Sequence, residues 1–407
     1  MNRTLRVVIV AVTVVVAIVL VNLVPAAESP STRAKADDLS FYQTSGATTP
    51  YPLTSEKEVR NVILCIGDGM SSGQIALASA KVGAKLHIER MPVTGLVQTR
   101  SANSRVTDSA AAATALATGV KTKNGMIGTA PNGQAYRSIL ELAKAAGMAT
   151  GLVATSTITH ATPASFGAHV RSRSSENAIA EQLLANRVNV LLGGGRKFFL
   201  PRSDRDSARK DNRDLIAEAR QAGYMYVTSE QELRSTQHPY VLGLFQLGAL
   251  TTEPPEPSLS TLAHEAIRLL RQAGQTAPTS NSGFFLMIEG SQIDSACHEH
   301  NARRAIRQTL LFDQAVQAVI DFALQDGHTL VIVTADHETG GLSLSRADEK
   351  NPDTQVRWST KGHTGSPVPI GALGPGAAIF AGTQDNTDIP SKTAQLLNIR
   401  PFPQLAQ

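Results

Sequence analysis

Carboxylate and imidazole side chains recur in this sequence at spacings that suit a bound metal ion. Asp294 and His298 are four residues apart, so a helical turn would place both on one face. Asp336 and His337 adjoin each other, and His363 lies in a glycine-rich stretch that lets a side chain point inward. Each motif alone more often has a structural role, but together they predict a metal centre. Two further carboxylates join this set, Asp68 and Glu289.

The types of these side chains restrict which metals fit. Oxygen and nitrogen ligands without a thiolate suit zinc at catalytic sites, and all-oxygen ligation suits magnesium. So many carboxylates in one place would repel one another without cations. The pattern therefore favours a catalytic centre with bound cations.

A serine at the start of an alanine-rich stretch offers a nucleophile. Ser109 follows Asp108, and the alanines up to Thr118 favour a helix that begins here. Either the two residues only cap that helix, or the hydroxyl of Ser109 lies at its positive end, where anions bind. The two readings are compatible. A serine needs a base or a metal for activation, and with no histidine near it in sequence, a metal is the better activator.

Arg173 is a candidate clamp for a phosphoryl group, because a planar guanidinium matches two phosphoryl oxygens. Arg171 shows that this segment carries charge anyway, so a surface arginine is the alternative. Spacing alone does not choose between them.

The framework that must position these residues is indicated by the apolar runs. Runs bounded by Gly, Asp or Thr and rich in β-branched residues are typical of buried parallel strands. They alternate with helical patterns, so we expect a three-layer α/β/α sandwich with a large, mostly parallel central sheet. The expected strands are 62–66, 151–154, 188–192, 284–288 and 330–334. The expected helices are 138–146, 178–185, 215–222, 259–273 and 302–324.

The candidate site residues cluster where the expected strands end. Sites of doubly wound sheets lie beyond the carboxyl ends of the strands. Asp68, Glu289 and Asp336 each follow an expected strand, and His160 and Thr162 follow another. The sequence thus predicts one site at one edge of the sheet.

Two other features concern the expected elements. The less regular segment 197–257 holds no comparable cluster, so we expect it to be peripheral. Glycines that follow helical patterns are typical helix ends. They are Gly147, Gly223, Gly274 and Gly327.

The first 27 residues differ from the rest of the chain. Arg3 and Arg6 precede an apolar run at 7–24, and small residues up to Ala27 suit signal peptidase cleavage. Residues 1–27 are therefore a signal peptide or an N-terminal membrane anchor, because the run is just long enough to span a bilayer. Both alternatives send the main body to the periplasm or the cell exterior.

Composition excludes several classes of protein. The chain has 407 residues, of which 42% are hydrophobic and 18% charged, and only two are cysteines. A disordered protein and a disulfide-rich scaffold are excluded, so stability must come from a core. The net charge of +4 falls to +2 if Arg3 and Arg6 leave with the leader. Without a lysine or arginine run, we expect no nucleic acid-specific binding. Residues 28–57, rich in Ser, Thr, Pro and Ala, are expected to be a flexible linker.

The motifs together resemble the alkaline phosphatase family. The resemblance extends over nearly the whole body and implies an alkaline phosphatase-like catalytic domain at 58–407. Several independent blocks in the family's order make it specific. The blocks are 61–70, 106–110, 118–122, 159–163, 169–173, 289–294 with His298, 333–337 and 363–365.

This resemblance implies metal-dependent hydrolysis of phosphate monoesters through a phosphoserine intermediate on Ser109, with two zinc ions and one magnesium ion. Arg173 would hold the phosphoryl oxygens, and Asp108 would position that arginine. The implied ligands are Asp294, His298 and His363 for one zinc, Asp68, Asp336 and His337 for the second, and Asp68, Thr162 and Glu289 for magnesium.

The sequence departs from well-known relatives at two positions near the site. His160 stands where some bacterial members carry aspartate, and an imidazole leaves room for zinc or cobalt in the third site. Ser295 stands where relatives often have a longer lysine, histidine or tryptophan that reaches toward phosphate. A short hydroxyl predicts a weaker hold on the product. Cys65 and Cys297 are expected to be packing thiols that do not pair.

Two other functions stay open on the sequence. One is a phosphodiesterase or sulfatase of the same superfamily, which the serine nucleophile and Arg173 disfavour. The other is a non-catalytic phosphate-binding protein, which the complete set of ligands disfavours. A homodimer, common in the family, is less secure here because the segment between His337 and His363 is short.

Overall fold

The computed structural model describes residues 35, 37–53, 57–275, 283–345 and 356–406. The chain forms two compact units, Met1–Asp38 and Leu39–Gln407, and the second contains the sheet and the site. The expected leader at 1–27 lies outside the described residues. Within the described ranges, no helix combines the length and apolar character needed to cross a bilayer.

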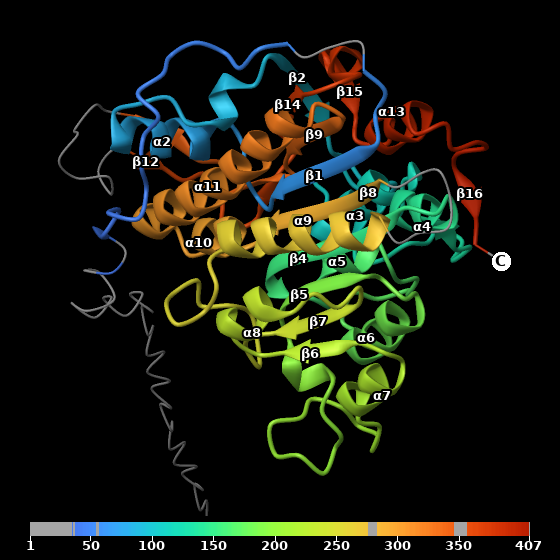
Figure 1. Ribbon diagram of the computed structural model, residues 1–407. Helices are drawn as coiled ribbons and strands as arrows, with labels where there is room; N and C mark the ends of the chain where they lie inside the picture. Colours follow the sequence, from blue (N-terminus) through green and yellow to red (C-terminus); the bar gives the residue numbers. More distant parts are fainter. Residues whose placement is uncertain (1–34, 36, 54–56, 276–282, 346–355, 407) are drawn as a thin grey trace, which may run out of the picture. The chain divides into compact units, whose positions relative to one another are not determined.

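A ten-stranded sheet forms the middle layer of the second unit (Figure 1). Only β14 runs antiparallel to its neighbours within this sheet, which confirms a large, mostly parallel sheet. The central strands are buried along their whole length, as expected for strands covered on both faces. In spatial order the strands are β15 (Gly382–Asp385), β2 (Val93–Gln98), β14 (Val368–Leu373), β9 (Thr329–Thr334), β1 (Asn61–Gly67), β8 (Phe284–Gly290), β4 (Ala149–Thr157), β5 (Val190–Gly194), β7 (Val241–Leu244) and β6 (Met225–Val227).

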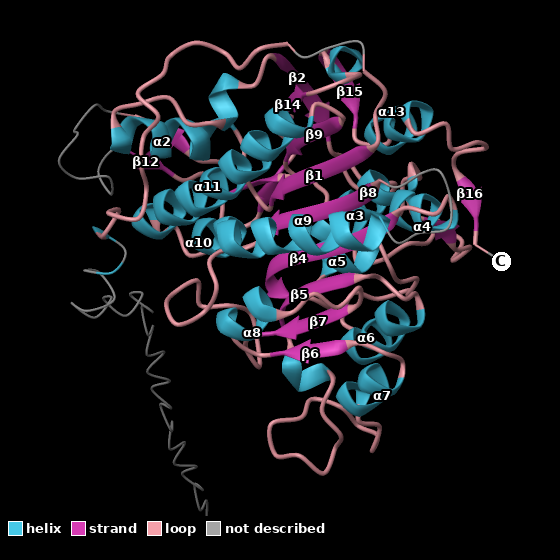
Figure 2. Ribbon diagram, viewed as in Figure 1, coloured by secondary structure: helices cyan, strands magenta, loops and turns pink. Residues whose placement is uncertain are grey.

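Helices form the two outer layers (Figure 2). On the side facing the viewer, α9 (Leu259–Gln275) and α11 (Ala302–Asp326) pack on the central strands, and α2 (Ser72–Val82) and α10 (Gln292–His298) pack on α11. On the far side lie α3 (Ser109–Thr118), α4 (Ile139–Ala145) and α5 (Ala161–Ser165). The other helices are α6 (Glu176–Ala185), α7 (Leu215–Gln221), α8 (Glu230–Ser235) and α13 (Asp388–Leu396), with short turns η1 (Ile88–Arg90), η2 (Arg196–Phe198) and η3 (Ala377–Phe380). Small antiparallel pairs join β10 (Glu338–Thr339) to β13 (His363–Thr364), β11 (Ser343–Leu344) to β12 (Val356–Arg357), and β16 (Gln404–Leu405) to β3 (Tyr136–Arg137).

All five expected strands and all five expected helices are present, but one helix end is wrong. Gly147, Gly223 and Gly327 take the left-handed conformation that ends a helix. Gly274 instead lies inside α9, which continues to Gln275. Gly274 is buried, so packing of α9 on the sheet and on α11 outweighs the low helix propensity of glycine.

The segment 197–257 belongs to the central sheet more than expected. It supplies β6 and β7, which extend one edge of that sheet beyond β5. These strands have only three and four residues, too few for a periodic signal. The segment holds none of the site residues, so its expected distance from the chemistry is confirmed.

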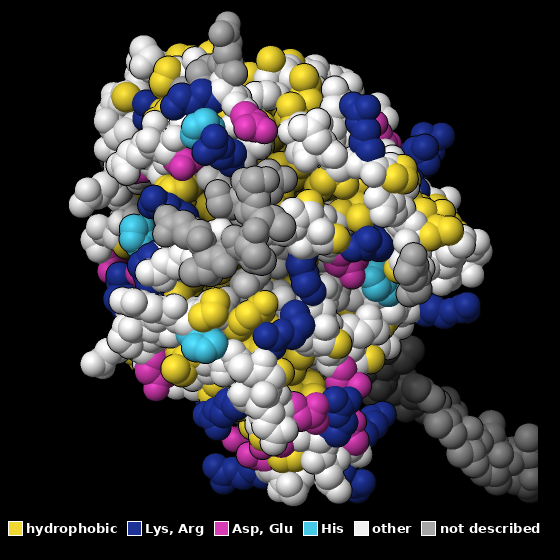
Figure 3. Space-filling model, turned by 45° about the vertical axis from the view of Figure 1, so that its right-hand side comes forward, with side chains coloured by type: hydrophobic (Ala, Val, Ile, Leu, Met, Phe, Trp, Pro, Cys, Tyr) yellow, Lys and Arg dark blue, Asp and Glu magenta, His cyan; other side chains and the backbone are white. Residues whose placement is uncertain are grey.

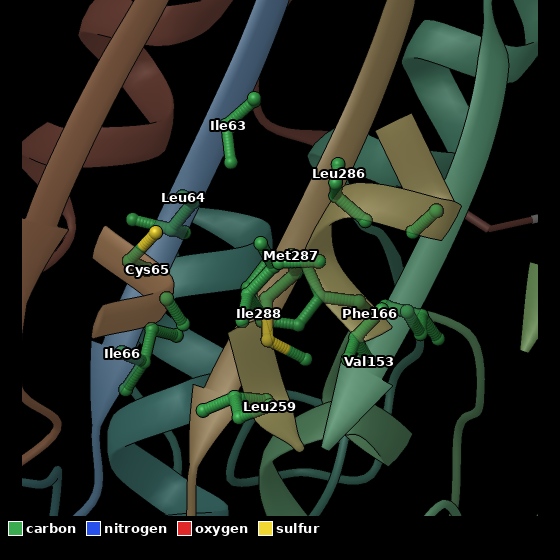
Figure 4. Packing of buried hydrophobic residues seen from close by; sticks show 14 of the residues in the cluster. Ile63, Leu64, Cys65, Ile66, Val153, Phe166, Leu259, Leu286, Met287 and Ile288 are labelled. Carbon is green, nitrogen blue, oxygen red and sulfur yellow. The ribbon is translucent and has the colours of Figure 1, made fainter. Parts of the chain in front are cut away.

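The core lies between the central strands and the helices on both faces. Figure 4 shows side chains of β1, β8 and β4 meeting Phe166, which follows α5, and Leu259, which begins α9. Phe166 stacks on Phe285 of β8 with ring centroids 6.1 Å apart. Cys65 and Cys297 are both buried and unpaired, which confirms the expectation of packing thiols. This packing makes the ends of the central strands a rigid base for a site.

Part of the expected linker is packed, which corrects its boundary. Tyr42 is buried, and its hydroxyl donates to Oδ2 of Asp313 on α11 at 2.6 Å. The same buried carboxylate accepts hydrogen bonds from the backbone N–H groups of His87 and Ile88, both at 2.9 Å. Residues 39–53 therefore belong to the folded unit, because Tyr42 is buried and Leu39, Phe41 and Tyr51 pack against the core, although most other side chains of this segment are exposed.

The surface carries charges of both signs side by side. In the space-filling view, lysine and arginine side chains alternate with aspartate and glutamate, most densely in the lower part (Figure 3). Arg213, for example, forms ion pairs with both Glu181 and Glu218. On this face there is no continuous basic surface, as the small net charge suggests.

Tyr42→Phe is expected to lower the free energy of unfolding by about 1 kcal/mol, because it removes one hydrogen bond to a buried carboxylate. Denaturant titration of the metal-loaded protein measures this change. Tyr136→Phe is the matched control, since Tyr136 is only partly buried, and its effect should stay below about 0.5 kcal/mol. Equal stabilities for wild type and Tyr42→Phe would mean that this contact does not hold residues 39–53 in place.

Candidate active site

The predicted site residues meet at one edge of the sheet. Strands β8 and β9 flank β1 in parallel register, with Ile66 opposite both Glu289 and Thr334. Asp68 therefore lies two residues beyond the level of Glu289, where β9 has just ended and Asp336 follows it. Glu289, which was predicted to follow a strand ending at residue 288, is instead the next-to-last residue of β8, because this strand continues to Gly290. Parallel strands thus deliver these carboxylates to one place, as expected.

A sharp turn after β1 lets helix α10 approach Asp68. Gly69 has a φ of +71°, and a Cβ there would lie 2.7 Å from Oγ1 of Thr339 and 2.9 Å from Cα of Asp294. Only glycine suits both the backbone conformation and the space. The turn at Asp68 and Gly69 therefore also allows Asp294 to approach Asp68.

The first predicted ligand set, Asp294, His298 and His363, is assembled; we call it the outer group. Asp294 and His298 both lie on α10, one helical turn apart, as predicted. Their ligand atoms and those of His363 lie within 4.8 Å of one another. Nε2 of His298 lies 3.3 Å from Oδ2 of Asp294 and 3.2 Å from Nε2 of His363. Of the three sets, this one is the most open to solvent, with 40% of the His298 side chain exposed.

The second predicted set, Asp68, Asp336 and His337, lies deeper. Nε2 of His337 lies 3.1 Å from Oδ2 of Asp336 and 3.5 Å from Oδ1 of Asp68. Oδ1 of Asp336 accepts hydrogen bonds from the backbone N–H groups of Gly69 and His337, which leaves Oδ2 without a partner. Asp294 also comes within reach of Asp68 and His337, so it borders both sets, although the sequence assigned it to one.

The third set contains a residue that the sequence treated as a departure. Ligand atoms of Asp68, His160 and Glu289 lie within 4.8 Å of one another. Thr162, the predicted ligand, is fully buried, and its hydroxyl has no hydrogen-bond partner among the described residues. Nε2 of His160 lies 3.0 Å from Nη2 of Arg173, while Nδ1 has no partner.

Burial of these carboxylates opposes their ionisation. Burial, and then the neighbouring carboxylates, raise the pKa of Asp68 well above its usual range. Burial also raises the pKa of Glu289 to about 7 and that of Asp336 to about 6. Both carboxylate oxygens of Asp68 are buried without a hydrogen-bond donor. A bound cation would remove this penalty, since it supplies the positive charge that the protein groups do not.

The pKa values of the histidines differ between the buried inner positions and the more exposed outer position. Burial lowers the pKa of His337 to about 4, and burial together with Arg173 lowers that of His160 to about 4. The hydrogen bond with Asp294 raises the pKa of His298 to about 9. Although burial opposes ionisation of Asp294, contacts with His298 and His337 hold the pKa of this carboxyl below its usual range. The inner imidazoles are therefore neutral, the form in which histidine binds metals.

Ser109 lies at the start of a helix that points into this cluster. It is the first residue of α3 and is 2% exposed, and Oγ lies 3.2 Å from Nε2 of His337. Asp108 is the N-cap, with Oδ1 accepting from the N–H of Ala111 at 3.0 Å. Asp108 therefore caps the helix, and the hydroxyl of Ser109 also lies at its positive end, so the two predicted arrangements occur together.

Arg173 is not a free surface arginine. Its Nη1 donates to Oδ2 of Asp108 at 3.1 Å, and Oδ2 also accepts from the N–H of Gly125 at 3.0 Å. One carboxylate thus caps the helix of Ser109 with one oxygen and holds the guanidinium with the other. Arg173 is partly exposed, at 29% of its side chain, and each Nη atom has a second N–H beyond its contact with Asp108 or His160.

Several residues that orient the ligands were missed in the sequence. Nδ1 of His298 lies 2.5 Å from the carbonyl of Lys361, and Nδ1 of His363 lies 2.9 Å from the carbonyl of Thr107. Because a carbonyl only accepts, both Nδ1 atoms carry a proton, so Nε2 is the atom that each ring would offer to a metal. The hydroxyl of Thr339 donates to Oδ1 of Asp294 at 2.5 Å. Backbone carbonyls leave no sequence signal; Thr339, two residues after His337, could have been suspected.

Ser295 and Cys297 lie beside the ligands of α10. Ser295 is partly exposed and follows Asp294 directly. Burial raises the pKa of Cys297 to about 12, and Nε2 of Gln74 contacts its sulfur at 3.6 Å. A buried thiol of this kind stays protonated, so Cys297 acts as a packing residue between two ligands.

A family model described as alkaline phosphatase matches residues 59–353. The chain belongs to the alkaline phosphatase family. It is 44% identical over 323 residues to alkaline phosphatase 4 of Bacillus subtilis, covering 75% of this chain and 67% of that protein. It is similar to the solved alkaline phosphatase of the Antarctic bacterium TAB5, at 35% identity and a TM-score of 0.76, covering 85% of this chain and all of that one. A variant of that enzyme, with one histidine changed to glutamate, holds magnesium in its M3 site; it is 35% identical over 85% of this chain and 99% of its own, with a TM-score of 0.75.

Membership in this family makes the chain a phosphomonoesterase that depends on metal ions. The donors present fit such ions, since buried carboxylate oxygens without hydrogen-bond partners among the described residues converge with imidazole nitrogens. The resemblance found in the sequence and the α/β fold that it implied are both confirmed.

Asp68→Asn is expected to have opposite effects on the metal-free and metal-loaded proteins. Without metal it should raise the free energy of unfolding by about 1–3 kcal/mol, because it removes a buried charge that has no hydrogen-bond donor. With metal it should lower the melting temperature, because a ligand is lost. Thermal melts with chelator, and after zinc and magnesium are added back, measure both effects.

The gain in stability that Asp68→Asn gives the metal-free protein should increase with pH. A carboxyl with a raised folded-state pKa stabilises the fold below its unfolded pKa and loses that contribution as the pH rises. The gain from Asp68→Asn should thus be larger at about pH 9 than at about pH 5. Asp206→Asn, at an exposed position, is the control and should change neither state. A metal-free variant less stable than the wild type at every pH would contradict the argument.

Proposed function

We propose that the protein hydrolyses phosphate monoesters through a phosphoserine intermediate on Ser109 and releases inorganic phosphate. The observation that carries this proposal is the position of the Ser109 hydroxyl. It lies at the N-terminus of α3, beside Nε2 of His337 and next to the guanidinium that Asp108 holds. A nucleophile, an anion clamp and the positive end of a helix therefore surround one small volume.

We further propose how the metal ions are divided among the ligands. The outer group of Asp294, His298 and His363 would hold one zinc ion, and Asp68, Asp336 and His337 a second. Bound there, the ions would supply Lewis-acid stabilisation of the attacking and leaving oxygens. The convergence of the ligand atoms supports the outer group. The contacts of Nε2 of His337 with Asp68 and Asp336 support the second set, although Asp294 also lies within reach of Asp68 and His337.

The third site would hold magnesium through Asp68, Thr162 and Glu289, with His160 beside it. The unpartnered hydroxyl of Thr162 and Oε1 of Glu289 support a hard cation at this place. His160 makes zinc or cobalt the alternative occupant. The related TAB5 variant, in which a histidine became glutamate and magnesium is bound, supports a link between such a histidine and the metal chosen.

The residues of the chain would act in two in-line steps. Oγ of Ser109, having lost its proton to solvent, attacks phosphorus, and the bond from phosphorus to the ester oxygen breaks as the alcohol leaves. Water then attacks the phosphoserine from the opposite side, so that phosphate departs, Ser109 is restored, and phosphorus keeps its configuration. Arg173 holds two phosphoryl oxygens in both steps. The work of the side chains is positioning and electrostatic stabilisation.

The proposed localisation rests on residues 1–27. We propose that residues 1–27 direct the catalytic unit to the periplasm or the cell exterior. Arg3, Arg6 and the apolar run at 7–24 support export. The mass of the mature chain distinguishes a cleaved signal peptide from an anchor that is retained.

Ser109→Ala is expected to reduce the turnover of p-nitrophenyl phosphate by about a thousandfold or more, because the nucleophile is lost. Initial rates under saturating zinc and magnesium measure this loss. Ser72→Ala is the matched control, since Ser72 is also the first residue of a helix after a strand end, but is exposed. Wild-type turnover by Ser109→Ala would refute the proposed mechanism. Faster hydrolysis of bis-p-nitrophenyl phosphate or p-nitrophenyl sulfate by the wild type would favour a phosphodiesterase or a sulfatase.

Ser295→Lys is expected to strengthen inhibition by phosphate about fivefold to tenfold, because an ammonium group would reach toward the bound anion. Inhibition constants from steady-state rates measure this effect. Ser295→Ala removes the hydroxyl without adding a charge and should leave the constant within about twofold of the wild type. Unchanged inhibition in Ser295→Lys would show that residue 295 does not face the phosphate.

A further inference from the structure

His300, the second residue after the ligand helix α10, has an unusual backbone conformation. His298 is the last residue of α10, and His300 has a φ of +55°. The backbone N–H groups of His300 and Asn301 bond back to the carbonyls of Cys297 and Ala296, at 3.0 and 2.9 Å. Glycine is the usual residue at such a left-handed helix end, because it has no Cβ. A side chain kept here against that preference must make contacts of its own.

The side chain of His300 makes two contacts, both with one loop. Its ring stacks on Trp358 with centroids 5.0 Å apart and planes 7° from parallel. Its Nε2 donates to the carbonyl of Thr360 at 2.7 Å. We call this arrangement of His300 and Trp358 the clip. It joins the end of α10 to residues 358–363, the 358–363 loop.

The 358–363 loop carries two atoms on which the outer group depends. The carbonyl of Lys361 accepts from Nδ1 of His298 at 2.5 Å and so turns Nε2 of that ligand toward Asp294. His363, at the end of the loop, is itself a member of the outer group. The position of the loop thus sets both the orientation of one ligand and the place of another.

On its other side, the loop is held by backbone hydrogen bonds and by packing of Trp358. The N–H of Ser359 donates to the carbonyl of Gly340, and the N–H of Gly340 donates to the carbonyl of Gly362, both at 2.9 Å. Trp358 packs on Gly340, where a Cβ would lie 2.5 Å from the indole ring. The indole ring thus contacts both the β10 end, through Gly340, and the α10 end, through His300. It connects the two segments between which the outer group lies.

The outer group needs such support more than the other two sets. Asp68, His337 and Glu289 are fully or almost fully buried, so packing holds their side chains. His298 is 40% exposed and is held mainly by hydrogen bonds. Partners that orient ligands in this way change metal affinity strongly when they are removed.

We propose that the clip of His300 and Trp358 positions the 358–363 loop and thereby sets the metal affinity of the outer group. His300 and Trp358 are positioning residues, since neither touches the ligand atoms themselves. The inference rests on the proposed function of Asp294, His298 and His363 as metal ligands. It adds a determinant of metal affinity outside the ligand set.

The test uses the full-length protein stripped with a chelator and titrated with zinc alone. Trp358 is the only tryptophan of the chain, so its fluorescence reports on the loop directly. Zinc competition against a chromophoric chelator gives the affinity of each equivalent. His300→Gly removes the side chain and suits the left-handed backbone, so the local fold is preserved.

The expected result is a loss of about tenfold or more in the affinity of one zinc equivalent in His300→Gly, with the other equivalents unchanged. Zinc should change the fluorescence of the wild type in step with that equivalent, and His300→Gly should need correspondingly more zinc. Trp358→Phe keeps a ring for stacking and should retain more affinity than Trp358→Ala. The melting temperature of the metal-free protein should be the same in all variants, which separates positioning from a general structural role.

His238→Ala is the matched control, because His238 also contacts a backbone carbonyl, that of Tyr240 at 3.0 Å, outside the site. Its zinc affinities should equal those of the wild type. Equal affinities in His300→Gly and the wild type would overturn the clip proposal and leave the metal ligands standing. A wild-type protein that binds no zinc would instead overturn the proposed function itself.

Discussion

The constraint on which this structure depends is the convergence of buried carboxylates at one edge of the sheet. Asp68, Glu289 and Asp336 approach one another where solvent is excluded, and Asp68 has no donor for either oxygen. Such groups cannot all be ionised without a cation, as the raised pKa of each indicates. The ionised carboxylates therefore carry an electrostatic penalty at this edge of the sheet, which a bound metal ion would relieve. Metal binding and folding stability are for this reason thermodynamically coupled in this chain.

The sheet can hold these carboxylates close together because it is buried on both faces. Helices α9 and α11 cover one side, and the strands β1, β8 and β9 stay in register up to the site. A site on loops alone could move its carboxylates apart. Here Glu289 lies within β8, which pairs with strands on both sides, and Asp68 and Asp336 follow one and two residues after strands of the same sheet. Rigid strands thus keep the ligands at short distances that repulsion would otherwise lengthen.

The sequence was sufficient for the parts of the molecule that leave a local signal. Continuous β-branched runs predicted the five central strands, and acidic or histidine residues after them predicted the site. β14 and the short strands β6 and β7 were missed, because they are held by neighbouring strands and have little pattern of their own. Residues 39–53 were taken for linker from their polar composition, although Tyr42 finds a partner 271 residues away in Asp313. The carbonyls that orient His298 and His363 come from Lys361 and Thr107, and no side-chain pattern reveals a backbone acceptor.

The hydrogen bonds around the ligands also show that the parts of the site are not independent. The carbonyl of Thr107, two residues before Ser109, holds His363, while Asp108 caps α3 and holds Arg173. Two of the three consecutive residues 107–109 therefore contact His363 and Arg173, and the third is Ser109, the proposed nucleophile. Asp294 and Asp68 in turn each border two ligand sets. A displacement of the 107–109 backbone would change metal geometry and nucleophile position together. Because one capped helix end carries Ser109 and holds both His363 and Arg173 by hydrogen bonds, it restricts the distances among the three groups, on which the proposed in-line displacement would depend.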